Sequence, residues 1–433
     1  MSLTVYKANI ISSRNYDELD VYEDAYLVEK DGIIEYVGKE LPEEYRNETV
    51  VDHGNRIMIP AFSDLHIHAS QYVERGVGMD SLLFDWLNNY TFPQEAGFRD
   101  TAYARKIYPQ LIRDLLRNGT LHAAFFTTIH YEACDIFFKM LGESGMYAYS
   151  GKINMDRNSP DYYVEDTKQS LADTERFIAE HLGMYPNVKP IVIPRFAPTC
   201  SEELLKGLGK LVRKYDVGLH THLVESKAEA AFAKECFPQY LSDGDIYEQT
   251  GLMDSDGPKI VAHVIFPTEV EERLLRKYKA VSVHCPDSTT NVTAGIMPVS
   301  DMHAKDLKIA LGCDIGGGHF AGIYRQVARS VQLSKMKEFY EEDYKRITFK
   351  NAFYLATVTG GEVFAKTGKL AKGYKMNCLL IDNMQDEGYT ITLEEALERF
   401  CYAGDDRNIK ARYIDGKLID PDEVYKRLIR EDL

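Results

Sequence analysis

Eight short apolar segments alternate with helix-like segments along the middle of this 433-residue chain. Eight strands with intervening helices over roughly 250 residues are typical of a (β/α)8 barrel, in which helices enclose a ring of parallel strands. The expected fold class is therefore α/β, with a (β/α)8 TIM-like barrel as its main part. The predicted strands are Ala61–His68, Leu121–Phe126, Tyr147–Met155, Pro190–Phe196, Val217–His222, Lys259–Val264, Val281–Cys285 and Lys308–Asp314.

Both ends of the chain show a different pattern, that of short antiparallel strands. Asp31-Gly32 and Asp415-Gly416 each lie between two apolar runs, and Asp-Gly in that setting is a strong hairpin signal. Cys378–Ile381 adds a further short strand. We therefore predict a small β-sandwich domain formed by both termini, residues 1–58 plus 370–433, beside a barrel of residues 59–369.

The overall charge and the cysteines limit the partners and the compartment. Lys and Arg number 51 against 67 Asp and Glu, a formal net charge of −16, which argues against nucleic acid or an anionic membrane surface as a partner. The seven cysteines are scattered and never spaced Cys-x-x-Cys, so neither a disulfide framework nor a thiolate zinc site is indicated. No apolar stretch reaches the ~18 residues of a membrane span. We expect a cytoplasmic protein.

Residues suited to chemistry gather at the predicted strand ends. In a barrel of this kind the carboxyl ends of the strands share one mouth, and the catalytic side chains come from there. His66 and His68 are two positions apart in a strand, so their side chains point to the same side. One such residue is often structural, but a histidine or carboxylate at five of the eight ends favours a functional site. The strand-end residues are His66, His68, Arg195, His222, His263, His284 and Asp314.

Neutral imidazoles together with one carboxylate suit zinc or ferrous iron. Such an ion lowers the pKa of a bound water from 15.7 toward ~7 and makes hydroxide available at neutral pH. A nearby carboxylate that is not a ligand can then carry protons, and Glu225, three residues after His222, is the best candidate for this role.

These stretches resemble the amidohydrolase superfamily, mononuclear subtype, and within it the guanine deaminases. The His-x-His pair and the later His and Asp mark the superfamily only. Three stretches are more specific to the guanine deaminases, and they are His68-Ala-Ser-Gln71, Pro194-Arg-Phe196 and Gly404-Asp-Asp-Arg-Asn408. The resemblance covers nearly the whole chain, although Asp287-Ser288-Thr289 departs from the usual pattern after the seventh strand.

The resemblance implies hydrolysis of guanine to xanthine and ammonia by a metal-bound hydroxide, with guanine as the small-molecule substrate. It implies one divalent metal per chain, normally Zn²⁺ with Fe²⁺ as the alternative, and we also expect a homodimer. Asp314 would in addition take a proton from the attacking water. His263 would polarise the substrate beside the metal, and Glu225 would be the proton shuttle. The implied metal ligands are His66, His68, His222 and Asp314, and the purine-binding residues are Gln71, Arg195, Phe196 and His263.

Trp86, the only tryptophan, either covers the purine ring or belongs to the core or an interface. Two other functions remain open at this stage. One is a related aminohydrolase acting on a pterin, a triazine or cytosine, and the other is a catalytically inactive scaffold that keeps the barrel.

Overall fold

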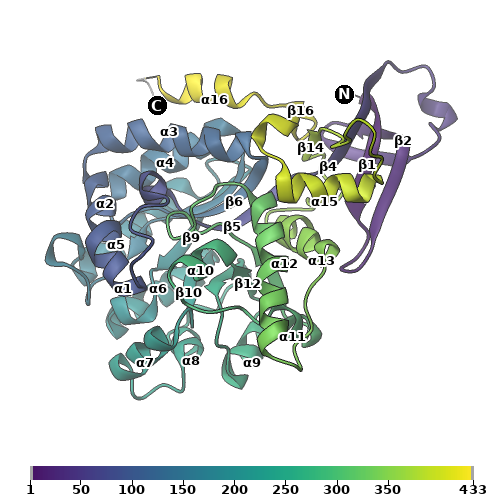
Figure 1. The fold of residues 1–433 in the computed structure, drawn as a ribbon. Coiled ribbons are helices and arrows are strands. Elements are labelled where there is room, and N and C mark those ends of the chain that lie inside the picture. The colour runs from purple at the N-terminus through teal and green to yellow at the C-terminus, as the bar shows by residue number, and fades with distance from the viewer. Residues whose placement is uncertain (1–2, 431–433) are drawn as a thin grey trace.

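A parallel barrel forms the body of the protein (Figure 1), and this fold confirms the predicted α/β class. The computed structural model describes residues 3–430. Hydrogen-bonded strands follow the order β13-β12-β11-β10-β9-β7-β6-β5, and β8 pairs with β9. The third predicted strand is therefore divided in two. The barrel strands are β5 (Phe62–His68), β6 (Thr120–Phe126), β7 (Tyr147–Gly151), β8 (Ile153–Asn154), β9 (Val188–Pro194), β10 (Gly218–Leu223), β11 (Lys259–His263), β12 (Val281–His284) and β13 (Lys308–Leu311).

The ring closes between its first and last strands, just beyond the end of β13. The Asp314 N–H donates to the His66 carbonyl at 2.8 Å, and the His68 N–H donates to the Ile315 carbonyl at 2.8 Å. The carboxylate of Asp64, which is fully buried, accepts the Cys313 N–H at 3.1 Å. The backbone that carries Asp314 is thus bonded directly to the backbone that carries the two histidines.

Helices surround the strands in Figure 1, and their apolar faces pack on the barrel. In α6, for example, Ser201 caps the first turn by accepting the Leu204 N–H, and the helix buries Leu204, Leu208 and Val212. The barrel helices are α3 (Thr101–Arg117), α4 (Tyr131–Ser144), α5 (Thr167–His181), α6 (Glu202–Tyr215), α7 (Lys227–Cys236), α8 (Asp243–Gln249), α9 (Glu269–Lys277), α10 (Pro286–Asn291), α11 (Val299–Ala304), α12 (Ile323–Tyr340), α13 (Phe349–Tyr354) and α14 (Gly360–Glu362).

One barrel loop, between β5 and α3, is long and contains helical turns of its own. It holds α1 (Leu83–Trp86), a π-helical turn (Leu87–Thr91) and α2 (Phe92–Ala96). Apolar side chains of this loop, including Phe92 and Trp86, are buried against the mouth of the barrel. The loop therefore forms part of the wall of the site described below.

The strands from both termini meet in a second sheet, as predicted, and this sheet is a single one of seven strands. Both predicted hairpins are present, with φ of 50° at Asp31 and 48° at Asp415, the positive values that a tight hairpin turn requires. The sheet has the order β16-β15-β14-β4-β1-β2-β3. Its strands are β1 (Leu3–Ser13), β2 (Leu19–Lys30), β3 (Ile33–Gly38), β4 (Val50–Pro60), β14 (Cys378–Ile381), β15 (Ile409–Ile414) and β16 (Lys417–Leu418).

Two C-terminal helices join this sheet to the barrel. In Figure 1, α15 (Leu393–Ala403) lies beside the terminal sheet, and α16 (Pro421–Leu428) packs along α3. Arg412 of β15 is buried and donates from Nε to the Leu116 carbonyl at the end of α3, at 2.8 Å. The terminal sheet is therefore anchored to the barrel through buried polar contacts as well as apolar ones.

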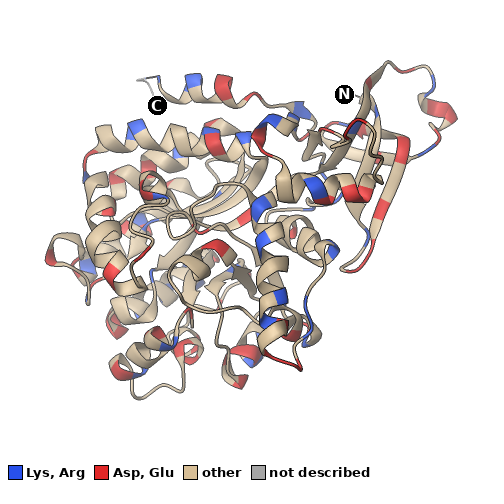
Figure 2. Cartoon of the chain, in the orientation of Figure 1, with Lys and Arg blue, Asp and Glu red and all other residues tan. Residues whose placement is uncertain are grey.

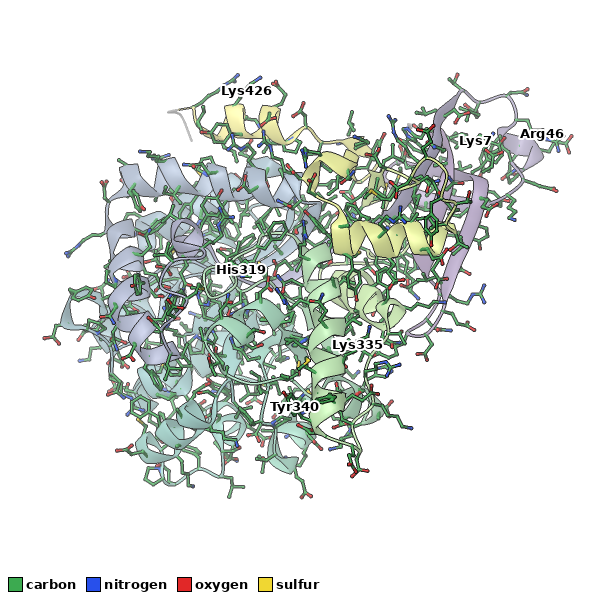
Figure 3. The ribbon with its side chains drawn as sticks, viewed as in Figure 1. Lys7, Arg46, His319, Lys335, Tyr340 and Lys426 are labelled. Carbon is green, nitrogen blue, oxygen red and sulfur yellow. The ribbon has the colours of Figure 1, made fainter. Side chains whose placement is uncertain are left out.

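Charged residues of both signs are mixed over the outer helices (Figure 2). Long side chains such as Lys7, Arg46 and Lys426 project from the rim of the molecule (Figure 3). Among the described residues, none of the helices is long and apolar enough to cross a membrane.

Candidate active site

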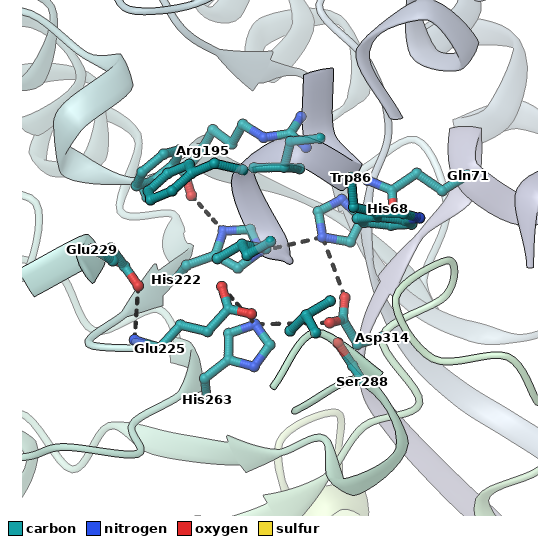
Figure 4. Close-up of a pocket in the computed structure, with 15 residues that line it drawn as sticks. His68, Gln71, Trp86, Arg195, His222, Glu225, Glu229, His263, Ser288 and Asp314 are labelled. Atoms are coloured by element: carbon teal, nitrogen blue, oxygen red, sulfur yellow. Dashed lines mark hydrogen bonds and ion pairs between the residues drawn. The ribbon is translucent and has the colours of Figure 1, made fainter. Parts of the chain in front are cut away.

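Five of the seven strand-end residues predicted from the sequence line one pocket at the mouth of the barrel (Figure 4). His68 ends β5, His222 lies in β10, His263 ends β11, and Asp314 follows β13. His66, two residues before His68 in β5, is fully buried. The pocket is lined by His68, Gln71, Leu83, Phe84, Trp86, Leu87, Arg195, Phe196, His222, Glu225, Glu229, His263, Ser288, Val292 and Asp314.

The ring nitrogens and the carboxylate at the base of the pocket converge closely. Asp314 Oδ1 lies 3.2 Å from His66 Nε2 and 3.4 Å from His68 Nε2. His222 Nε2 is 3.2 Å from His68 Nε2. His263 Nε2 is more distant, 3.8 Å from Asp314 Oδ2. Four donor atoms from three parts of the barrel thus lie near one another, with a fifth close by, and they form two overlapping groups that share His66.

Contacts outside this cluster orient two of the imidazoles. His222 Nδ1 lies 2.6 Å from the Arg195 carbonyl, so Nδ1 carries the proton and donates it, and Nε2 presents a lone pair to the cluster. His66 Nδ1 lies 2.9 Å from His220 Nε2, and a proton on that Nδ1 likewise leaves Nε2 free. This arrangement, in which the far nitrogen is held by a hydrogen bond, is how metal-binding histidines are usually oriented.

The charge state of the cluster fits a cation. Burial lowers the pKa of His68 and His222 well below the usual range and that of His263 to about 3, so these rings are neutral at physiological pH. Burial alone would raise the pKa of Asp314, but the neighbouring imidazoles His66, His263 and His68 outweigh it and hold that pKa well below its usual range.

Several donor atoms of the cluster have no hydrogen bond. The buried Nε2 atoms of His66 and His263 have no hydrogen-bond partner among the described residues. Unpartnered lone pairs that face one another are unfavourable in a buried site, and a divalent cation between them removes that cost. His66, His68 and Asp314 lie close enough together to bind one ion, and so do His66, His222 and His263.

The backbone at the strand ends adopts uncommon conformations. His263 has a φ of 73° and Asp314 a φ of 49°, both in the left-handed region that residues other than glycine rarely occupy. Such strained residues persist where the surrounding structure holds them, and they gather at functional sites. Here the strain turns both side chains into the pocket.

Glu225 lies across the pocket from the upper group of Arg195 and Gln71, next to His263 (Figure 4). Its Oε2 is 3.7 Å from His263 Nε2. Burial, and then the charge of Asp314, raise the pKa of Glu225, whereas Arg195 opposes the shift. The Glu225 N–H donates to Glu229 Oε2 at 2.7 Å, so a second buried carboxyl group fixes the backbone of the first.

Glu229 makes the stability of the fold depend on pH. Burial and the charge of Glu225 raise its pKa to about 8, from an ordinary value of 4.5. Between those values the folded state binds more protons than the unfolded state, so the free energy of unfolding falls as pH rises from about 4.5 to 8. We expect the free energy of unfolding of Glu229→Gln to fall less over this pH range, by at most about 1.4 kcal/mol per pKa unit. Urea unfolding of the wild type and the variant at pH 5, 6.5 and 8 measures this difference. Parallel pH profiles of the two proteins would contradict the prediction.

One residue that contacts both Gln71 and Arg195 was not predicted from the sequence. Glu95, in α2, is fully buried. Its Oε1 accepts the Gln71 amide N–H at 2.6 Å, and its Oε2 accepts from Arg195 NH1 at 2.6 Å. No local pattern in the sequence pointed to Glu95, because a glutamate is usually exposed.

The remaining predicted residues lie as follows. Trp86 lines the pocket and is buried, and its Nε1 donates to the Val77 carbonyl at 3.1 Å. Phe196 lines the pocket beside Arg195. His284 is buried but is not among the lining residues or the clustered ligands. The segment after β12 contributes Ser288 and Val292 to the wall.

A model of the amidohydrolase family matches residues 57–419, most of the chain. The chain belongs to this family. Its members of known function include close relatives of this protein. A guanine deaminase of Dictyostelium discoideum is 32% identical, over 96% of this chain and 98% of its own. One from Escherichia coli is 30% identical, over 92% and 91%.

A solved structure of a guanine deaminase is also similar to this protein. The guanine deaminase of C. acetobutylicum, determined with guanine bound in its active site, is 41% identical and superimposes with a TM-score of 0.94. That superposition covers 97% of this chain and all of the other. The similarity therefore extends over the barrel and the terminal sheet together.

Proposed function

We propose that this amidohydrolase is a guanine deaminase, which hydrolyses guanine to xanthine and ammonia. The observation that carries the proposal is the pairing of a metal-ligand cluster with the buried Arg195 and Gln71 in one pocket. The 41% identity to a guanine deaminase with guanine in its active site supports the same conclusion. A related aminohydrolase acting on a pterin, a triazine or cytosine, and an inactive scaffold, are both less well supported by these relatives.

We assign the metal to His66, His68, His222 and Asp314, because their donor atoms converge and two of the rings are oriented by outside contacts. One ion per chain fits this single cluster, and the nitrogen-rich donor set favours Zn²⁺ over Mg²⁺ or Ca²⁺, with Fe²⁺ as the alternative. When bound there, the ion would supply a water activated for attack at neutral pH.

The protein's own residues carry the protons. The attacking water adds at C2 of guanine and gives a proton to Asp314. The low pKa of Asp314 keeps this carboxylate ionised before the reaction, so it can accept that proton. Glu225, with its raised pKa, delivers a proton to N3, the ring nitrogen beside C2 that has a free lone pair. His263 lies within 4 Å of both carboxylates and would polarise the reacting centre. The C2 amino group then takes the proton held by Asp314 and leaves as ammonia. The added hydroxyl returns a proton to Glu225 as the C2 carbonyl forms.

We assign recognition of the base to the side of the pocket that holds Arg195 and Gln71. A guanidinium presents several N–H donors in one plane, which suits the carbonyl oxygen O6 of guanine. Arg195 is the only arginine among the lining residues, and Gln71 adds a side-chain amide. Trp86 and Phe196 provide aromatic surface for the flat ring.

The direct test is release of ammonia and xanthine from guanine by the purified protein. Activity that is lost with a chelator and restored by zinc or ferrous iron would support the proposal. The same assay with adenine, cytosine, a pterin amine and an amino-triazine separates the alternatives, because a faster reaction with any of them would replace guanine as the substrate.

The division into residues 1–58 plus 370–433 and residues 59–369, the homodimer and the cytoplasmic location stay predictions. The break between β4 and β5 at Ala61 supports the first boundary. Light scattering of the purified protein measures the oligomeric state. A mass that corresponds to one chain would contradict the predicted homodimer.

A further inference from the structure

Glu95 connects the two side chains that face the purine, although it does not itself line the pocket. Its two carboxylate oxygens are divided between them, Oε1 to the Gln71 amide and Oε2 to Arg195 NH1, at 2.6 Å each. Glu95 is fully buried, and Arg195 and Gln71 are each about 2% exposed. Water therefore cannot replace either contact.

The carboxylate determines which way the Gln71 amide faces. The Gly316 N–H donates to Gln71 Oε1 at 2.9 Å, so the oxygen of the amide faces Gly316. A carboxylate accepts only, so the nitrogen end must face Glu95. With both ends specified, the amide has one orientation, and its second N–H is the group left to meet a ligand.

The same carboxylate balances the charge of Arg195. The guanidinium carbon lies 5.1 Å from the centre of the Phe92 ring, in the same loop as Glu95. A buried guanidinium with no counter-ion is strongly unfavourable, whereas a paired one is tolerated. Glu95 holds NH1 by one end-on contact, which leaves the arginine able to bond a second acceptor.

We propose that Glu95 is the positioning residue that sets guanine specificity, by fixing Arg195 and Gln71 for the O6 side of the base. This inference rests on the proposed guanine deaminase activity. Glu95 acts through its two hydrogen-bonded partners, and its Oε1 also lies 4.0 Å from His68 Nδ1, beyond hydrogen-bond distance. We therefore expect its loss to weaken recognition of O6 while the metal content of the same sample stays near that of the wild type.

Glu95→Gln is the sharpest variant. An amide of the same shape offers one acceptor and one donor, so its N–H₂ end must face a donor on either Gln71 or Arg195 and break that contact. We expect KM for guanine to rise by about 10-fold or more, the usual effect of losing one charged hydrogen bond, with a smaller change in kcat.

The discriminating probe is 2-aminopurine, which keeps the reacting C2 amine and lacks O6. Its inhibition constant against guanine turnover should change by less than ~3-fold in Glu95→Gln, because Arg195 has no O6 to meet. A merely structural role would weaken both ligands alike. Equal loss for guanine and 2-aminopurine, or no change for guanine, would overturn the inference.

Two further variants complete the design. Glu165→Gln is the matched control, since it removes a carboxylate from another buried ion pair, Lys152–Glu165, that does not line the pocket. It should leave the preference for guanine over 2-aminopurine unchanged. Glu95→Asp keeps the charge but is too short to reach both partners, and it should shift the same preference even if Glu95→Gln fails to fold. Wild-type protein inactive on guanine would instead refute the proposed function.

Discussion

Glu225→Gln should lower the turnover of guanine by ~10²-fold or more, while metal content and purine binding stay near those of the wild type. The amide keeps the shape of the side chain but cannot give up a proton to the ring or regain one. Glu225 is buried beside His263 and has a raised pKa, which suits a proton donor at neutral pH. The measurement is steady-state turnover together with metal analysis of the same sample.

Glu229→Gln serves as the control for that variant. It changes a neighbouring buried carboxyl group, and its amide oxygen can still accept the Glu225 N–H. We expect it to keep turnover within ~10-fold of the wild type. Near-normal turnover in Glu225→Gln would remove Glu225 from the proposed mechanism.

Asp314→Ala should abolish activity because the protein no longer retains its metal. The variant removes the carboxylate that lies within 3.4 Å of both His66 and His68, and it leaves the imidazoles facing one another without a counter-charge. Wild-type protein should hold about one divalent ion per chain after gel filtration, and the variant a small fraction of that. Elemental analysis is the measurement.

His284→Ala is the matched control for metal content. His284 ends the neighbouring strand β12 and is equally buried, but it is outside the convergent cluster. Its metal content should stay close to one per chain. Two ions per wild-type chain, or none in active protein, would contradict the mononuclear assignment.

The barrel was predictable because most of its strands combine an apolar run with a functional residue at the end. Those two signals are local, and they placed β5, β10 and β11 to within about two residues. The last strand was predicted too long, through Asp314, whereas β13 ends at Leu311. After Leu311 the chain bonds to β5 instead and turns at Asp314 with a positive φ, which no local pattern in the sequence signals.

Glu95 was not predictable in the same way. A glutamate near the start of a helix is usually exposed, so its residue type indicates a surface position. Its partners Gln71 and Arg195 are 24 and 100 residues away in the chain, and only the folded barrel brings all three together. The histidines could be predicted as site residues from their own residue type and spacing. The role of Glu95 depends on contacts between distant residues, which the sequence does not show.

The way the ring closes has a consequence for how the protein is made. Asp64 lies two residues before His66, and Cys313 directly precedes Asp314. The two are hydrogen-bonded across 249 residues of chain. At ~5–20 residues per second, a ribosome needs roughly 10 to 50 s to add that much polypeptide. Throughout this interval His66 and His68 lack their carboxylate partner. The complete set of four ligands therefore forms only after the last strand has docked, and a product terminated before β13 lacks the carboxylate ligand.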